Sequence, residues 1–196
     1  MNSLAKFYPV MPDLDWIGAI VPLGVKLVQL RLKDAPQGEI ERQIIGALDV
    51  CRAHGAQLIV NDYWKQAIRL GADYIHLGQE DLIKADMNAI RTAGIKVGIS
   101  THSRGELSIA LEKQADYIAL GPIYETNLKK MKWDPQGLDR IGEWKSLISQ
   151  PLVAIGGINL QRAEGVLKAG ADSIAVVTDI VTAHDRDETV RKWLRI

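Results

Sequence analysis

The sequence has no excess of charge of one sign, only one cysteine and no long apolar run. Lys plus Arg and Asp plus Glu each number 24, so no basic surface favours nucleic acid and no acidic tail is indicated. The single cysteine, Cys51, excludes a disulfide framework and a thiolate metal site, and a buried free thiol is its usual role. These absences favour small molecules, rather than nucleic acid, as partners.

The chain also lacks a segment of the kind that targets a protein to a membrane or anchors it there. Its first residues, MNSLAKFYPVMPDLDW, contain no apolar stretch typical of a signal peptide. No run of about 18 apolar residues could span a bilayer. We therefore expect a cytoplasmic protein without a membrane partner. At 196 residues, we expect a single domain over residues 1–196, and the sequence leaves the oligomeric state open, a homo-oligomer included.

Short apolar segments alternate along the chain with amphipathic segments of helical period. The apolar segments predict strands at residues 7–10, 27–31, 58–60, 74–77, 96–101, 117–120, 152–155 and 173–177. The amphipathic segments predict helices at residues 14–23, 36–55, 64–70, 82–93, 105–113, 138–149, 163–169 and 188–194. In the longest of these helices, we expect an inward apolar face of Ile40, Ile44, Ile45, Leu48 and Val50.

This alternation predicts an α/β fold with a parallel sheet covered by helices. A weak internal repeat, LGADYIHLG, QADYIALG and AGADSIAVV, supports the same division of the chain. Eight strand-then-helix units are the number that closes a (β/α)₈ barrel, and we expect that architecture. An open doubly wound sheet is the alternative, but it normally has a glycine-rich turn after its first strand, where this chain has Met11-Pro12-Asp13.

Acidic residues follow two successive predicted strands, at residues 58–60 and 74–77. Asn61 and Asp62 come after the first, and Asp81 after the second. Parallel strands joined by a right-handed crossover end at the same edge of the sheet, about 4.8 Å apart if they are neighbours. Because only oxygen ligands are on offer, the pair Asp62 and Asp81 predicts a Mg²⁺ site. The alternative is that each aspartate caps the helix after it.

Residues at the other predicted strand ends complete a candidate site at the mouth of the barrel. They are Gln29, Arg31, Lys33, Gln79, Ser100, His102, Thr126, Lys129, Gly156, Gly157, Val177 and Thr178. If the second strand continues, Gln29, Arg31 and Lys33 share one face. The cations after the second and sixth strands, Arg31, Lys33 and Lys129, facing the acidic pair, predict a pocket for Mg²⁺-bound diphosphate. The backbone of Gly156-Gly157, ahead of a helix, predicts a second anion site for a phosphate.

The four histidines are expected in three settings. His76 should pack inside the barrel, whereas His54 and His184 should lie on the surface. His102 follows the fifth predicted strand near the mouth, where it would act as an acid–base group or make a structural hydrogen bond.

The chain as a whole resembles the thiamine phosphate synthase family. The resemblance rests on the ordered segments YPV (8–10), QLRLK (29–33), VNDYW (60–64), HLGQEDL (76–82), GISTH (98–102), YIALGPIYETNLKK (117–130), PQGL (135–138), VAIGGI (153–158) and SIAVVTDI (173–180). It implies a (β/α)₈ barrel that joins 4-amino-2-methyl-5-hydroxymethylpyrimidine diphosphate to a thiazole phosphate, with release of diphosphate. Both substrates are small molecules.

The resemblance also implies roles for single residues. The pyrimidine diphosphate would be held by Gln29, Leu30, Arg31, Leu32, Lys33, Asn61, Ser100 and Lys129. The thiazole phosphate would be held by Thr126, Asn127, Leu128, Lys129, Gly157, Val177 and Thr178. Mg²⁺ would be bound by Asp62 and Asp81. Among these, Arg31, Lys33, Ser100 and Lys129 would act in catalysis, by stabilising the departing diphosphate.

Two positions depart from the usual pattern of that family. Leu128 stands where the loop usually has threonine, and Thr178 where the last strand usually ends in serine. The departure at Leu128 leaves open a rival function, a thiazole tautomerase of the same fold, in which His102 would move a proton. A phosphate-ligand-binding barrel without catalysis is a further alternative, because binding and catalytic residues coincide. The acidic pair and the QLRLK segment favour the synthase, because a tautomerase has no diphosphate to bind.

Overall fold

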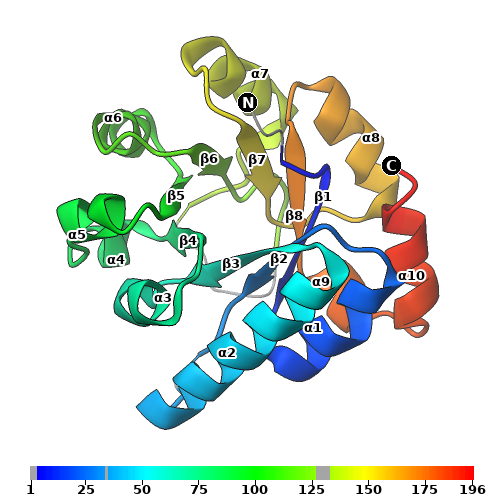
Figure 1. Cartoon of the computed structure of the whole chain (residues 1–196). Helices are drawn as coiled ribbons and strands as arrows, with labels where there is room; N and C mark the ends of the chain where they lie inside the picture. Colours follow the sequence, from blue (N-terminus) through cyan, green and yellow to red (C-terminus); the bar gives the residue numbers. More distant parts are fainter. Residues whose placement is uncertain (1–3, 34, 127–132) are drawn as a thin grey trace.

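The barrel expected from the sequence is present in the computed structural model, which describes residues 4–33, 35–126 and 133–196. Within that part of the chain, eight parallel strands are hydrogen-bonded in sequence order, and β8 pairs with β1 to close the barrel (Figure 1). The strands are β1 (Phe7–Met11), β2 (Leu27–Leu30), β3 (Gln57–Asn61), β4 (Tyr74–Leu77), β5 (Lys96–Thr101), β6 (Tyr117–Leu120), β7 (Leu152–Ile155) and β8 (Ser173–Val176).

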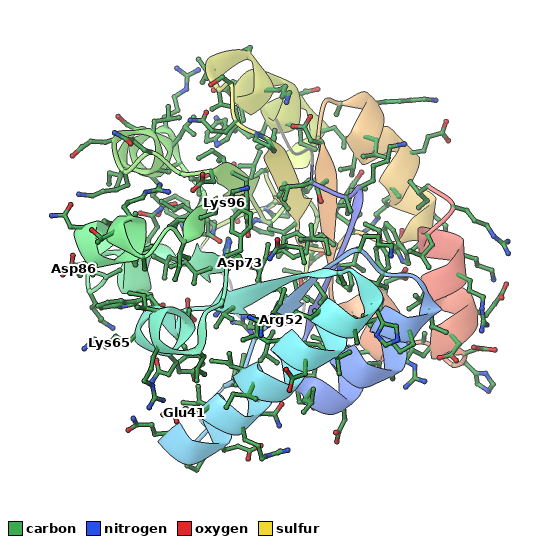
Figure 2. The ribbon with its side chains drawn as sticks, viewed as in Figure 1. Glu41, Arg52, Lys65, Asp73, Asp86 and Lys96 are labelled. Atoms are coloured by element: carbon green, nitrogen blue, oxygen red, sulfur yellow. The ribbon has the colours of Figure 1, made fainter. Side chains whose placement is uncertain are left out.

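Helices connect the strands and form the outer layer (Figure 1). They are α1 (Leu14–Ile20), the 3₁₀ helix η1 (Val21–Leu23), α2 (Gln37–His54), α3 (Trp64–Leu70), α4 (Gln79–Leu82), α5 (Met87–Thr92), α6 (Arg104–Glu112), α7 (Gly137–Leu147), α8 (Leu160–Lys168), α9 (Thr178–Val181) and α10 (Arg186–Trp193). Side chains such as Lys65 and Asp86 point outward from this layer (Figure 2). No helix of the described ranges combines the length and apolar character that crossing a membrane requires.

The structure corrects some of the predicted elements. The helix predicted at residues 82–93 is two helices, α4 and α5, because the Asp86 side chain accepts a hydrogen bond from the Ala89 N–H at 3.0 Å and starts a new one. Strand β2 ends at Leu30, so Arg31 and Lys33 lie beyond the strand rather than on one of its faces. The short helix α9, directly after β8, was absent from the prediction.

Two apolar regions hold the fold together. One lies between the barrel and its helices, and the other fills the barrel interior with residues such as Tyr8, Ile59, Tyr117 and Val153. The inward face predicted for α2 was wrong at one position, since Ile45 is 47% exposed.

The buried face of α2 consists of Ile40, Gln43, Ile44, Ala47, Leu48 and Cys51. Cys51 is thus buried as expected, and burial raises the pKa of its thiol to about 12.

Gly98 of β5 makes room for an aromatic ring inside the barrel. Gly98 and Tyr117 are register partners, and a Cβ added at Gly98 would lie 2.5 Å from the Tyr117 hydroxyl oxygen and closer still to the ring.

We expect Gly98→Ala to lower the free energy of unfolding by about 1–3 kcal/mol, because Tyr117 is fully buried and has no free volume to enter. Urea denaturation measures this. Gly105→Ala, in α6 with only Ser103 nearby at 3.8 Å, is the matched control and should be neutral or stabilising. Equal stabilities of the two variants would contradict the prediction.

Candidate active site

The two aspartates of the predicted metal site lie together at the carboxyl ends of neighbouring strands. Strands β3 and β4 pair in parallel, with Asn61 opposite His76, and the Asp62 N–H donates to the His76 carbonyl at 2.9 Å. Both carboxylates lie beside Gly78, whose N–H donates to the Asp62 carboxylate. A Cβ built on Gly78 would be 3.9 Å from Asp81 Oδ2. The predicted convergence of these two residues is therefore confirmed.

The alternative, that each aspartate caps a helix, is wrong. Helix α3 begins after Tyr63, and α4 begins after Gly78, and neither start has a side-chain capping bond. Asp62 instead has a backbone φ of 64°, in the left-handed region that side chains other than those of Asn and Asp seldom occupy. Such a conformation costs free energy and recurs at functional sites. It turns the Asp62 carboxylate towards the site, where the Asn61 amide donates to it.

The electrostatics of Asp62 fit a cation. Burial and, second to it, the negative charge of Asp81 raise the pKa of its carboxyl to about 6, and the positive charge of Arg31 opposes both. A second cation beside the pair would offset this cost. No group of three or more His, Cys, Asp or Glu residues of the described ranges could hold a metal ion. Two carboxylates are nevertheless what Mg²⁺ commonly takes from a protein when phosphate oxygens and water fill its other positions, so the residues fit Mg²⁺.

A chain of hydrogen bonds runs from this site through the barrel interior. The Gln29 amide nitrogen donates to the Tyr8 hydroxyl at 2.7 Å, and that hydroxyl lies 2.9 Å from the Tyr117 hydroxyl. Tyr117 Oη lies 2.7 Å from His76 Nδ1, and His76 Nε2 lies 2.8 Å from Ser100 Oγ. The position expected for His76 is thus confirmed. Burial, together with the positive charge of Arg31, lowers the pKa of the imidazole to about 4, so His76 is neutral at neutral pH.

The sequence reasoning missed Tyr8 and Tyr117 as members of this site. The available signal was that Gln29 and His76 each interrupt an otherwise apolar strand, and such buried polar groups need partners. Ser100 is half-buried at the end of β5, and its carbonyl accepts a hydrogen bond from the Gln79 amide at 2.6 Å. Gln79 therefore fixes the strand end that carries Ser100.

The loops after β6 and β7 meet through their backbones. The Ile123 N–H donates to the Ile155 carbonyl at 2.9 Å, and the Tyr124 N–H to the Gly156 carbonyl at 3.0 Å. This pairing brings Gly157, ahead of α8, beside the segment that leads to Thr126, as the predicted phosphate site requires.

Gly157 has a positive φ of 65°, and a Cβ there would lie 2.8 Å from Tyr124 Cβ and closer to the Glu125 carbonyl oxygen. Arg162, which the sequence did not single out, donates to the Gly157 carbonyl, and its guanidinium lies 4.4 Å from the Tyr124 ring centroid.

Several predicted ligand-binding residues have clear positions and others do not. The side chains of Leu30 and Leu32 are buried in the apolar core, so only their backbones could contact a ligand. Lys33 and Thr178 are exposed, and Val177 connects β8 to α9. Three predicted residues, Asn127, Leu128 and Lys129, lie outside the described residues.

His102 makes the structural interactions that were one of its two expected roles. Its Nδ1 lies 2.8 Å from a Glu106 carboxylate oxygen, which also accepts from the His102 backbone N–H. Its ring stacks on Trp133 with centroids 5.8 Å apart. His54 and His184 are exposed, as predicted.

Comparison with known proteins shows the family of this chain. The family model described as thiamine monophosphate synthase matches residues 7–180. A thiamine-phosphate synthase of Rhizobium etli is 53% identical over 192 residues, which cover 97% of this chain and 94% of that protein. One of Neisseria gonorrhoeae is 43% identical over 194 residues, or 98% and 95% of the two chains. Among solved structures, a thiamine phosphate pyrophosphorylase of Pyrococcus furiosus superposes with a TM-score of 0.85 at 29% identity, covering 97% of this chain and 93% of that one. The chain belongs to the thiamine monophosphate synthase family.

Proposed function

We propose that this protein joins 4-amino-2-methyl-5-hydroxymethylpyrimidine diphosphate to a thiazole phosphate, forming thiamine phosphate and releasing diphosphate. The observation that carries the proposal is the carboxylate pair Asp62 and Asp81 at the mouth of the barrel, with the charge of Arg31 acting on Asp62. This arrangement suits a metal-bound diphosphate. Family membership and the names of the relatives support the same reaction.

Asp62 and Asp81 would hold Mg²⁺, and Asn61 orients Asp62 through its amide. When bound, Mg²⁺ supplies positive charge that stabilises the departing diphosphate. Arg31, Lys33 and Lys129 would add cationic hydrogen-bond donors to the diphosphate oxygens, which is the strong, charge-assisted kind of bond.

In the reaction, the bond between the pyrimidine methylene carbon and the diphosphate oxygen breaks, and a bond from that carbon to the thiazole nitrogen forms. The aminopyrimidine can delocalise the positive charge that develops on the carbon, so departure can precede attack. No covalent nucleophile of the protein is needed. The task of this chain is to hold the two substrates in line and to stabilise the charge on the leaving group.

The thiazole phosphate would bind where the loops after β6 and β7 meet. Backbone N–H groups ahead of α8 offer donors for its phosphate. Thr126 and Gly157 belong to this region, and Val177 and Thr178 border it from the end of β8. Because backbone donors need no particular side chain, the leucine at position 128 is compatible with this binding mode.

Product formation from the two purified substrates tests the proposal. We expect release of one diphosphate per thiamine phosphate, dependent on both substrates and on added Mg²⁺, and abolished by a chelator. Conversion of the thiazole phosphate alone would identify a tautomerase instead. Binding of both substrates without turnover at any Mg²⁺ concentration would identify a non-catalytic barrel. Turnover unaffected by a chelator would contradict the metal assignment and leave the synthase activity standing.

A further inference from the structure

The hydrogen-bonded chain inside the barrel has one end that fixes its direction. Gln29 is 4% exposed, and its amide nitrogen, which can only donate, faces the Tyr8 hydroxyl. Tyr8 therefore accepts at its oxygen. Its own hydrogen is left to donate to Tyr117, the other bonded neighbour of that hydroxyl in the described part of the chain.

The same reasoning extends to the other end of the chain. Tyr117, having accepted from Tyr8, donates to Nδ1 of His76. A neutral imidazole accepts at one nitrogen and donates at the other, so the His76 hydrogen is on Nε2 and goes to Ser100 Oγ. With its oxygen accepting from His76, the Ser100 hydroxyl keeps its hydrogen for an acceptor at the mouth of the barrel.

The opposite direction leaves one group without a partner. Ser100 would donate to Nε2, His76 would donate from Nδ1 to Tyr117, and Tyr117 would donate to Tyr8. The Tyr8 oxygen would then receive two hydrogens, and its own hydrogen would face no acceptor among the described residues. Tyr8 is 1% exposed, so water cannot replace the missing acceptor, and a buried hydroxyl without a partner is costly.

We propose that His76 is a positioning residue that turns the Ser100 hydroxyl outward to donate to the diphosphate. It does so in the tautomer with the hydrogen on Nε2, which Gln29 imposes through Tyr8 and Tyr117. The proposal rests on the proposed function only in naming diphosphate as the acceptor. Hydrogen bonds in such a chain polarise one another, which makes the terminal hydroxyl a better donor. The barrel interior thus contributes to anion binding through side chains that never touch the ligand.

Nitrogen-15 NMR of the histidine side chains tests the direction without any ligand. In the full-length protein at neutral pH, His76 should show a protonated Nε2 and an unprotonated Nδ1, its signals being assigned by their loss in His76→Gln. A hydrogen on Nδ1, or on both nitrogens, would overturn the proposal whether or not the protein is a synthase.

The variant Gln29→Glu should reverse the chain, because an ionised carboxylate can only accept. Measured where carbon-13 shifts show that the new carboxyl is ionised, His76 should then carry its hydrogen on Nδ1. Gln57→Glu, which adds the same group at the other end of a neighbouring strand, should leave the tautomer unchanged. If Gln29→Glu does not fold, the tautomer of the unmodified protein alone decides.

Affinity for inorganic diphosphate with Mg²⁺ tests the consequence. Ser100→Ala should weaken binding roughly tenfold or more, the loss expected for a hydrogen bond to a charged group. In the Gln29→Glu background, where Ser100 would point away from the ligand, the same substitution should have little further effect. A purely structural role for His76 predicts equal losses in both backgrounds. Failure of the unmodified protein to bind diphosphate would count against the proposed function, whereas the tautomer would still be decided by NMR.

Discussion

Asp62→Asn should abolish turnover at low Mg²⁺ concentration and at the same time stabilise the ligand-free protein at neutral pH. Turnover is lost because an amide oxygen is a much weaker Mg²⁺ ligand than a carboxylate, and excess Mg²⁺ should restore part of it. The backbone should not change, since asparagine tolerates the positive φ of 64° at this position. Steady-state rates over a Mg²⁺ titration measure the effect.

The gain in stability follows from the raised pKa of Asp62. The pKa of a freely solvated aspartate, as in the unfolded chain, is 3.8, and that of Asp62 in the folded protein is about 6. Below the lower value both folded and unfolded states are protonated, and the carboxyl has no effect on stability. As the pH rises from the lower to the higher value, the unfolded state ionises first, so the folded state loses relative stability. That loss is complete above the folded-state pKa.

A shift of about two pKa units corresponds to about 3 kcal/mol, which partial exposure of the carboxyl reduces to about 1–2 kcal/mol. Urea denaturation should therefore show Asp62→Asn more stable than the parent at about pH 7.5 and equal to it at about pH 3.5. The control is Asp86→Asn, at an exposed helix start where asparagine caps as well as aspartate. It should change neither turnover nor stability. Normal turnover of Asp62→Asn with unaltered Mg²⁺ dependence would remove Asp62 from the metal site.

Gly157→Ala should lower both stability and turnover, and its main kinetic effect should be on the thiazole phosphate. The new Cβ would collide with the Glu125 carbonyl oxygen and lie 2.8 Å from Tyr124 Cβ, and the φ of 65° is itself strained for alanine. The loop after β6 must then move away from the turn after β7. We expect the free energy of unfolding to fall by about 1 kcal/mol or more.

Separate titrations of the two substrates show where this distortion acts. The KM for the thiazole phosphate should rise more than that for the pyrimidine diphosphate, whose predicted ligands other than Lys129 lie on other loops. Gly165→Ala, within α8 and with only an ordinary contact of 3.7 Å to Leu138, is the matched control and should be neutral or stabilising. An equal rise in both KM values would place the thiazole phosphate elsewhere.

The sequence predicted the barrel well because its strands are nearly continuous apolar runs. The strands at residues 74–77, 117–120 and 152–155 match the structure at both ends. Residues placed directly after strands, such as Asp62, were also found where expected, since parallel strands end at one edge. The boundary between α4 and α5 was missed because the apolar residues keep a helical period across it. The N-cap at Asp86 nevertheless starts a new helix there.

The interior hydrogen bonds could not be predicted in the same way. They join Tyr8 to Tyr117, residues 109 positions apart, across a space that exists only once the barrel has closed. Which inward side chains meet there depends on the register of all strands of the barrel. The period of apolar residues along one strand does not specify that register. The exposure of Ile45 has a similar cause. The face of α2 that contacts the barrel is narrower than the apolar face seen in the sequence, so one apolar residue remains outside the contact.

The burial of Cys51 has a practical consequence for following ligand binding. Its thiol is the only one in the chain, and a pKa of about 12 leaves almost no thiolate at neutral pH, so it should be inert to maleimide reagents. A cysteine introduced at an exposed position of the barrel mouth outside the predicted ligand-binding set, as in Glu125→Cys, would be the single reactive thiol. A fluorophore attached there would report when each substrate arrives, and mixing the two in either order would reveal whether one must bind first.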